Sequence, residues 1–166
     1  MPERETIQRA REDAREGKSP STQAGEFVRE EMDHIREGKH GARSTKQAIA
    51  IGLSKARRAG VKLPLPARGR VSSRTLAQAR RDNQKGRKSS HNKPSPKRSR
   101  AVVKALQREG HSAASPESLA RQARRSALAR GPAARHRAAL KAVKTKGQKG
   151  LQQAARKAAR TRAANS

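Results

Sequence analysis

The 166-residue sequence contains no cysteine, tryptophan or tyrosine, and Phe27 is its single aromatic residue. Without cysteine the chain has no disulfide framework, no thiolate zinc site and no cysteine nucleophile. It has no run of about 18 apolar residues, so we expect no membrane span and no membrane partner. The first residues lack the apolar stretch of a secretory signal. These absences favour a protein of the reducing cytoplasm.

Large apolar side chains are also scarce. Leu, Ile, Val and Phe together number 20, or 12% of the chain, whereas a globular core usually needs more than about 20%. Most other apolar residues are the 30 alanines, which favour helix but bury little area. Because so little apolar material can wall a pocket, we expect no enzyme: no catalytic residue, no cofactor and no small-molecule substrate.

Acidic residues are few and unevenly placed. The chain has 42 Lys and Arg against 13 Asp and Glu, a net charge of +29. Residues 1–40 hold ten acids and eight bases, whereas residues 41–166 hold three acids and 34 bases. Solubility needs a net charge of only about 2–8, so a basic block of this length favours a polyanionic partner. The N-terminal forty residues therefore have a different task from the rest.

Apolar spacing predicts an all-α fold, in which helices over 22–37 and 45–59 pair as an antiparallel hairpin. Ser44 and Gln47 form a capping-box pattern at the start of the second helix. We expect the hairpin to pack through Phe27, Val28, Ile35, Ile49 and Leu53. The expected organisation is a charged N-terminal helix in 1–19, the hairpin domain in 20–66, a basic linker with a short helix in 67–99, and an Ala/Lys/Arg-rich helical tail in 100–166.

The tail is expected to contain short basic helices joined by disordered linkers, without a large shared core. Ser99 is the expected cap of a helix over 100–109, and Ser115 with Pro116 begins the next helix, which ends before Gly131. Two further helices follow over 133–146 and 151–164. Their apolar faces are nearly all alanine, so we expect them to be completed by a partner.

The shortage of aromatic rings also bears on the type of nucleic acid. Modules that bind single strands stack bases on several aromatic rings, so this chain favours the backbone of a duplex or of folded RNA. Ser95-Pro96-Lys97-Arg98 is similar to the turn-forming repeats of linker-histone tails, which place cations in the minor groove. The expected nucleic-acid-binding residues are Lys55, Arg57, Arg58, Arg68, Arg70, Arg80, Arg81, Lys85, Arg87, Lys88, Lys97, Arg98, Arg100, Arg121, Arg124, Arg125, Arg135, Arg137, Lys141, Lys144, Arg156, Lys157, Arg160 and Arg162.

Two more specific sites are disfavoured by the residue spacing. No two of the five histidines are three or four residues apart, so we expect no metal site. The hairpin could act as a helix-turn-helix with 45–59 as the recognition helix. That helix starts with Gln47, Ala48 and Ile49 instead of a row of base-reading side chains, so recognition of a specific sequence is disfavoured.

One stretch carries a family resemblance. Glu26–Pro64, and within it the motif KHGARSTKQAIAIGLSKARRAG at Lys39–Gly60, resembles a domain of small basic bacterial proteins of uncharacterised function that are commonly labelled DNA-binding. Residues 98–146 are similar to the Ala/Arg-rich extension of such proteins, and the C-terminal segment resembles bacterial histone-like tails. The resemblance implies a bacterial origin and carries over no catalytic residue.

The sequence thus favours a bacterial nucleoid-associated, histone-like protein that binds duplex DNA through its phosphates with low sequence specificity, in the cytoplasm at the nucleoid. RNA or ribosome association is the first alternative, because basic chains of this kind also thread ribosomal RNA. The second alternative is a head that binds a protein partner and a basic tail that localises it. The 20–60 hairpin is also a candidate surface for homodimer formation.

Overall fold

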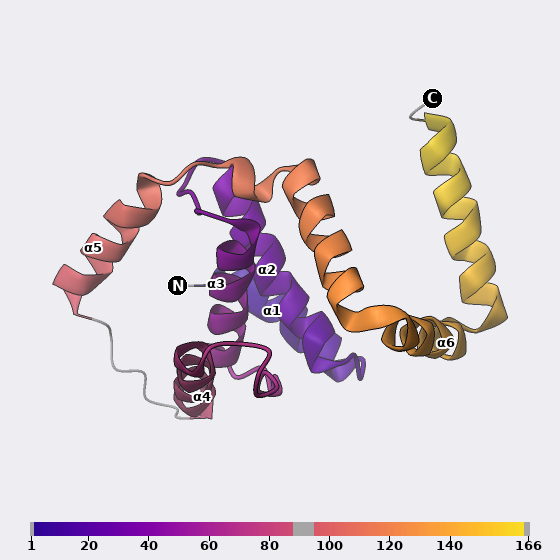
Figure 1. Cartoon of the computed structure of the whole chain (residues 1–166), viewed down its shortest axis with the longest axis horizontal. Helices are drawn as coiled ribbons and strands as arrows, with labels where there is room; N and C mark the ends of the chain where they lie inside the picture. Colours follow the sequence, from indigo (N-terminus) through magenta and orange to yellow (C-terminus); the bar gives the residue numbers. More distant parts are fainter. Residues whose placement is uncertain (1, 88–94, 165–166) are drawn as a thin grey trace. The chain divides into compact units, whose positions relative to one another are not determined.

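A computed structural model of the chain describes residues 2–87 and 95–164. These residues form six α-helices, one short 3₁₀-helix and no β-strand, so the expected all-α class is confirmed. The elements are α1 (Arg4–Arg15), α2 (Pro20–Arg36), α3 (Thr45–Arg58), α4 (Ser73–Arg87), α5 (Pro96–Gln107), η1 (Ser112–Ala114) and α6 (Pro116–Ala164), and Figure 1 labels the six α-helices. No helix within the described ranges has an apolar stretch long enough to cross a bilayer. Residues 88–94 of the basic linker expected in 67–99 lie outside the described residues.

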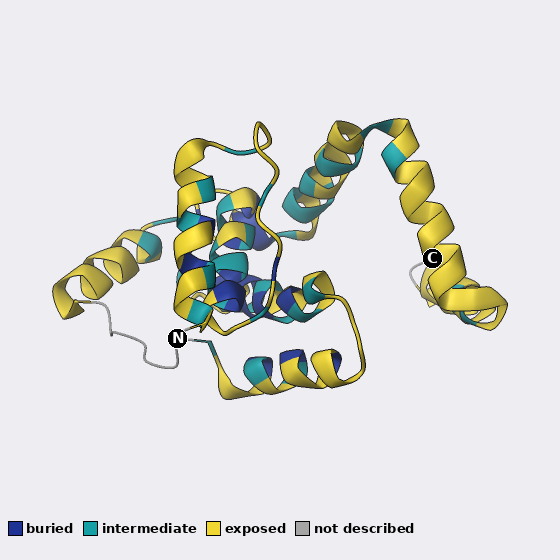
Figure 2. Ribbon diagram, turned by 90° about the horizontal axis from the view of Figure 1, so that it is seen from below, coloured by how far each residue is buried: buried dark blue, intermediate teal, exposed yellow. Residues whose placement is uncertain are grey.

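The chain divides into two units, Met1–Ala120 and Arg121–Ser166. The first, here called the compact unit, extends beyond the 20–66 hairpin on both sides and includes α1, α4, α5 and η1. The second, here called the basic unit, consists of most of α6, which has no buried residue. Buried residues in Figure 2 accordingly lie in the compact unit, and α6 is mainly exposed.

Helices α2 and α3 pack against each other as the predicted antiparallel hairpin. Phe27 and Ile35 on α2 are fully buried, and both belong to the predicted apolar stripe. Gly52 lies where α3 comes closest to α2, because a Cβ atom built there would be 2.7 Å from the Cα of Val28. A larger residue at position 52 would force the two helices apart.

Capping side chains fix the ends of these helices. The Ser44 Oγ accepts a hydrogen bond from the Gln47 N–H at 3.2 Å, as the capping-box pattern predicted. The Gln47 side chain reaches back to the N–H of Arg43 at 3.0 Å. Helix α2 begins at Pro20, one or two residues before the expected start, because proline fits the first turn of a helix after Ser19.

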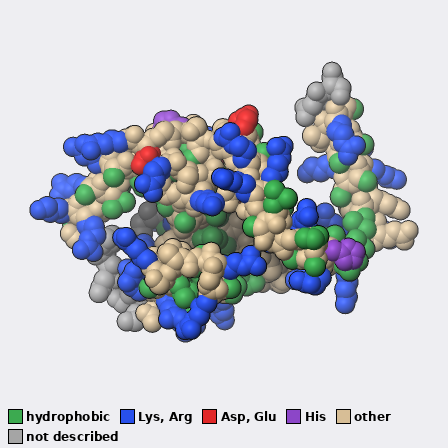
Figure 3. Space-filling model, in the orientation of Figure 1, with side chains coloured by type: hydrophobic (Ala, Val, Ile, Leu, Met, Phe, Trp, Pro, Cys, Tyr) green, Lys and Arg blue, Asp and Glu red, His purple; other side chains and the backbone are tan. Residues whose placement is uncertain are grey.

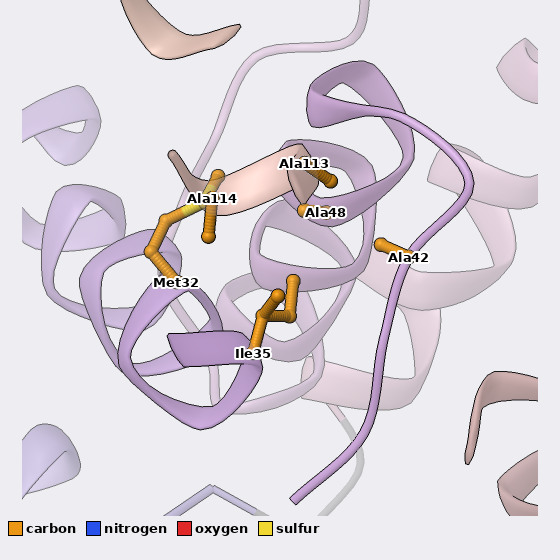
Figure 4. Close-up of a cluster of buried hydrophobic side chains, with 6 residues drawn as sticks. All are labelled: Met32, Ile35, Ala42, Ala48, Ala113 and Ala114. Atoms are coloured by element: carbon orange, nitrogen blue, oxygen red, sulfur yellow. The ribbon is translucent and has the colours of Figure 1, made fainter. Parts of the chain in front are cut away.

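The compact unit has two small apolar clusters. One joins α1, α2, α3 and the extended segment after α3, through Ala10, Ala24, Phe27, Ala56 and Leu63. The other, drawn in Figure 4, contains Met32, Ile35, Ala42, Ala48, Ala113 and Ala114. Of the remaining residues expected to pack in the hairpin, Val28 and Ile49 are partly buried against the second cluster and Leu53 against the first.

Ala113 and Ala114 come from a segment that the sequence pattern assigned to the basic tail. The Thr45 hydroxyl donates to the Ala113 carbonyl at 2.7 Å, and the Arg36 Nε donates to the Ala114 carbonyl at 3.1 Å. Residues 112–114 are therefore held on the hairpin by polar contacts as well as by apolar packing.

The connector between α2 and α3 is also held by this distant segment. The Gly41 N–H donates to the Leu106 carbonyl at 2.9 Å, and the Ala42 N–H donates to the Gly110 carbonyl at 3.1 Å. A Cβ atom at Gly41 would collide with the carbonyl of Glu109, so only glycine permits this approach. The connector is consequently an ordered part of the fold.

Ser99 and Ser115 were both predicted to begin helices, with different outcomes. Ser99 was expected to cap a helix over 100–109, and this is wrong: α5 begins at Pro96, so Ser99 lies inside its first turns. Proline at the first helical position starts the helix earlier than the serine. The predicted cap at Ser115 is confirmed, since its Oγ accepts from the Ser118 N–H at 3.2 Å.

Helix α6 is interrupted at two glycines. Gly131 has φ 75° and ψ 167°, and Gly147 has φ 62° and ψ −179°, a backbone region open essentially only to glycine. The interruptions divide α6 into segments 116–130, 132–146 and 148–164, close to the three helices that the sequence predicted. Gly150, expected as a further interruption, continues the helix.

Candidate nucleic-acid interface

Most bases in the first forty residues are paired with acids. The Arg9 Nε lies 2.7 Å from the Glu26 Oε2, and the Lys18 Nζ lies 2.7 Å from the Asp13 Oδ1. Three further pairs, Arg29–Glu26, Arg36–Asp33 and Lys39–Glu37, bring the paired bases to five of the eight. The surface of α1 and α2 therefore offers a polyanion little uncompensated positive charge.

Lys55, an expected nucleic-acid contact, is half-buried and paired with two carboxylates of α2. Its Nζ lies 3.0 Å from the Glu30 Oε1 and 2.7 Å from the Glu31 Oε2, and both carboxylate side chains are only 1% exposed. Burial by itself would lower the pKa of Lys55, but the adjacent carboxylates of Glu31 and Glu30 outweigh it and raise that pKa. The ammonium group thus remains charged and joins α3 to α2.

Burial and ion pairing also act in opposite directions on Glu30. Desolvation would raise its pKa, but hydrogen bonds from Lys55 and from the backbone N–H of Glu3 dominate, so the pKa lies below its usual value of 4.5. The ion pairs of Lys55 therefore contribute to stability above the usual pKa of a glutamate. The contribution is lost as the pH falls through the lowered value and Glu30 becomes protonated.

The last turn of α3 is likewise occupied by internal contacts. Arg57 is buried, and its Nη2 donates to the Pro64 carbonyl at 3.3 Å; burial lowers the pKa of its guanidinium group. The Arg58 Nε donates to the Asp82 Oδ1 at 2.7 Å. Arg57 and Arg58, both expected nucleic-acid contacts, therefore make internal contacts, and Arg58 connects α3 to α4. Cations at a helix C-terminus suit the helix dipole whether they contact the fold or a nucleic acid. Their position in the sequence therefore could not distinguish an internal contact from a nucleic-acid contact.

The first exposed basic surface consists of α4 and the loop before it. Residues 67–87 hold seven bases and a single acid, Asp82. Asp82 is 1% exposed and accepts from Arg58, Ser54 and Gln78, so it adds little negative charge to the surface. The seven exposed bases are Arg68, Arg70, Arg74, Arg80, Arg81, Lys85 and Arg87.

A shallow hollow of about 390 Å³ opens within this surface. Arg68 from the loop and Arg80 from α4 line it, together with the apolar side chains of Val71 and Leu76. The first turn of α4 lies at the hollow, and a helix N-terminus favours anions. Two guanidinium groups beside this turn make the hollow suitable for a phosphate.

Helix α5 carries a second exposed basic surface and buries none of its residues. It packs against no other helix of the described chain. The Ser95-Pro96-Lys97-Arg98 tetrapeptide does not form the expected turn, because Pro96 to Arg98 begin the helix. The exposed cations here are Lys97, Arg98, Arg100, Lys104 and Arg108. Lys88, another expected contact, lies outside the described residues.

The basic unit has the most one-sided charge. Residues 121–166 contain fourteen Lys and Arg and no acid, and every cation in the described range 121–164 is exposed. Figure 3 shows many of these blue side chains along the later part of α6. All the expected nucleic-acid-binding residues from Arg121 to Arg162 are therefore exposed to solvent on α6.

Helical spacing divides these cations into faces. At about 100° per residue, three cations lie within a sector of about 40–100° in each segment of α6. These triads are Arg121, Arg124 and Arg125; Arg137, Lys141 and Lys144; and Lys149, Arg156 and Arg160. Arg130 and Arg135 lie elsewhere on the helix, and their Nε atoms donate to the Ser126 and Gly131 carbonyls four residues earlier.

The structure also brings together three residues that the histidine spacing did not reveal. Glu31 and His34 lie one turn apart on α2, and His40 lies in the connector; their ligand atoms are all within 4.8 Å of one another. The missed signal is the Glu31-x-x-His34 spacing, which places a carboxylate and an imidazole on one helix face. Spacing between histidines alone overlooked it.

Residues 17–66 match the model of a family of unknown function, DUF6496. The matched segment covers α2, α3, their connector and the extended residues that follow. No curated protein and no solved structure matches the chain. The candidate interface on α4, α5 and α6 therefore lies outside the matched segment.

Proposed function

We propose that this chain is a non-enzymatic, nucleoid-associated DNA-binding protein that contacts duplex phosphates with low sequence specificity. The observation that carries the proposal is the basic unit, in which fourteen cations are accompanied by no acid and α6 buries no residue. A helix that buries no residue and carries many more cations than acids gains most by lying along a polyanion.

The dimensions of α6 suit this partner. A segment of 15 residues is about 22 Å long, and duplex DNA carries one charge per ~1.7 Å, so roughly 13 phosphates lie alongside each segment. The interruptions at Gly131 and Gly147 allow the three segments to align separately with the duplex. Each segment then presents one triad of cations to the backbone.

Low sequence specificity follows from the contacting groups. The exposed cations are distributed along whole helices, and Phe27, the one aromatic ring, is buried in the compact unit. Contacts to phosphates position a protein on DNA without reading the bases. The hollow at Arg68 and Arg80 would add phosphate contacts of the same kind from the compact unit.

The proposal is tested by measuring binding of the full chain to a labelled duplex across a salt series. Because each neutralised phosphate contributes about −0.9 to the slope of log K against log salt, we expect a slope steeper than about −5. Changing the duplex sequence at fixed salt should leave the affinity nearly unchanged. A flat slope, or affinity lost with the change of sequence, contradicts the mechanism. Stronger competition by ribosomal RNA than by duplex DNA would reassign the protein to RNA.

A pair of variants with equal charge tests the role of the faces. Arg137→Gln/Lys141→Gln/Lys144→Gln removes one triad, and its slope should be less steep by about 3. Arg130→Gln/Arg135→Gln/Lys146→Gln removes the same charge from other faces, so a smaller change is expected. Equal changes in both variants would mean that only total charge matters.

A further inference from the structure

Glu31, His34 and His40 form a cluster that the proposed function does not use. The Glu31 Oε1 lies 3.3 Å from the His40 Nε2, and the two imidazole rings meet edge-on with centroids 6.0 Å apart. The side chains of Glu31, His34 and His40 are 1%, 13% and 15% exposed. This burial distinguishes the cluster from the exposed carboxylates common on protein surfaces.

We propose that these three residues bind one divalent transition-metal ion, with Zn²⁺ as the best match. Two imidazoles and a carboxylate are typical zinc ligands, with bonds of about 2.0–2.2 Å. In a tetrahedral site such bonds place neighbouring ligand atoms about 3.3–3.5 Å apart. The Glu31–His40 distance already has this value, and the His34 nitrogen lies within 4.8 Å of both. Side-chain rotation alone would close the remaining distance.

The Glu31 carboxylate is held in place by a neighbouring ion pair. Its Oε2 lies 2.7 Å from the Lys55 ammonium, whereas its Oε1 lies 3.3 Å from the His40 Nε2. Lys55 therefore positions Glu31 through one oxygen, and the other oxygen remains on the side of the histidines, where it can bind a metal ion.

A carboxylate beside the cluster can orient one of the histidines. The Glu3 Oε1 lies 2.8 Å from the His34 Nε2 and 3.4 Å from the Lys39 Nζ. Glu3 can therefore accept a hydrogen bond from the His34 ring, as carboxylates do around zinc histidines, and solvent would supply the fourth ligand. The ammonium groups of Lys39 and Lys55 face the cluster, but Glu3, Glu30 and Glu31 give it more negative than positive charge.

A metal at this position would act on the fold. His40 lies in the connector, directly before Gly41 and Ala42, whose N–H groups hold the segment 106–110. Coordination would tie the connector to α2 through Glu31 and His34. Since binding only to the folded chain raises stability, the ion would stabilise the part of the compact unit that joins the hairpin to the segment before α6.

The test is a Zn²⁺ titration of the full, chelator-treated chain by calorimetry near neutral pH, without nucleic acid. We expect uptake of one ion per chain, a rise in Tm, and visible absorption typical of tetrahedral cobalt when Co²⁺ replaces Zn²⁺. His34→Gln and His40→Gln should each weaken Zn²⁺ binding by about tenfold or more. Binding should also weaken as the pH is lowered, because only neutral imidazole binds metal.

His136→Gln is the matched control, because His136 is exposed in the basic unit and its loss should change nothing. Circular dichroism establishes that each variant is folded, and the two cluster variants provide independent tests if one fails to fold. The proposal is overturned if the chain takes up no Zn²⁺. It is also overturned if the folded His34→Gln or His40→Gln variant binds as tightly as the unaltered chain.

Discussion

The two units use the same basic residues in opposite ways. In the compact unit, Lys55 and Arg58 pair with buried carboxylates, and Arg57 is itself buried. The basic unit contains no acidic residue, and every described cation there is exposed. A lysine or arginine in this chain therefore stabilises the fold where carboxylates and an apolar cluster are adjacent to it. On an exposed helix without acidic residues, the same side chain is available to bind a polyanion.

The helices of the two units also differ in what stabilises them. Phe27 and Ile35 anchor α2 against its neighbours through burial, whereas Leu128 and Leu140 on α6 remain 69% and 56% exposed. Most helical stability in proteins comes from packing an apolar face. The segments of α6 depend instead on alanine propensity against the repulsion of like charges, so a polyanion should stabilise them strongly.

The largest expected effect follows from removing most of the basic unit. Deleting residues 132–166 removes ten of its fourteen cations but keeps the segment 116–130, in which Leu119 packs on the core. The deletion removes two of the three triads, or six phosphate contacts, so the slope of log K against log salt should be less steep by about 5, and duplex affinity at ~50 mM salt should fall by several orders of magnitude. The measurement is titration of a labelled duplex by the full and shortened chains.

The same shortened chain tests the independence of the compact unit. Its urea unfolding midpoint without DNA should match that of the full chain, because no buried residue is removed. A markedly lower midpoint would mean that the two units share stabilising contacts. Retained duplex affinity would instead assign DNA binding to α4 and α5.

Much of the compact unit could be predicted from local patterns. The apolar stripe through Phe27 and Ile35, the cap at Ser44 and the interruptions at Gly131 and Gly147 each depend on a few neighbouring residues. Helical spacing, capping and glycine conformation are local properties. The stripe, the cap and the interruptions could therefore be predicted without knowledge of the tertiary structure.

Contacts between distant segments could not be predicted in the same way. Ala113 and Ala114 look like any alanines of the basic half, yet they complete the cluster around Ile35. Lys55 lies 24 and 25 residues from Glu31 and Glu30, and their pairing depends on the register of α2 against α3. The expected interface therefore included Lys55 and Arg57, whose burial depends on tertiary packing.

The second prediction concerns a cation of the compact unit. Lys55→Met leaves Glu30 and Glu31 buried without their ammonium partner, and breaking such a pair costs about 3–5 kcal/mol. Lys55 is itself 20% exposed, so we expect a loss near the lower end, about 3 kcal/mol in the free energy of unfolding. Urea unfolding followed by circular dichroism measures it.

Lys46→Met is the matched control, because Lys46 lies on the same helix and is exposed. It should change the free energy of unfolding by less than about 0.5 kcal/mol. Both variants lose one charge, so their duplex affinities should differ little wherever both remain folded. A Lys55 variant that is fully stable but impaired in DNA binding would support Lys55 as a nucleic-acid contact.

The smallest expected effect tests whether the basic unit needs its bends. At Gly147, φ 62° and ψ −179° are closed to alanine, so Gly147→Ala should favour one continuous helix and raise the helical circular dichroism signal. The segments 132–146 and 148–164 could then no longer align separately with the duplex, and we expect an affinity loss of about threefold. Gly150→Ala is the matched control, because Gly150 is in a helical position and the substitution gives a similar gain in helix propensity, about 1 kcal/mol, without removing a bend. An equal change of duplex affinity in both variants would show that helix propensity matters and the bend does not. A loss of affinity confined to Gly147→Ala would mean that the segments of the basic unit align separately with the duplex.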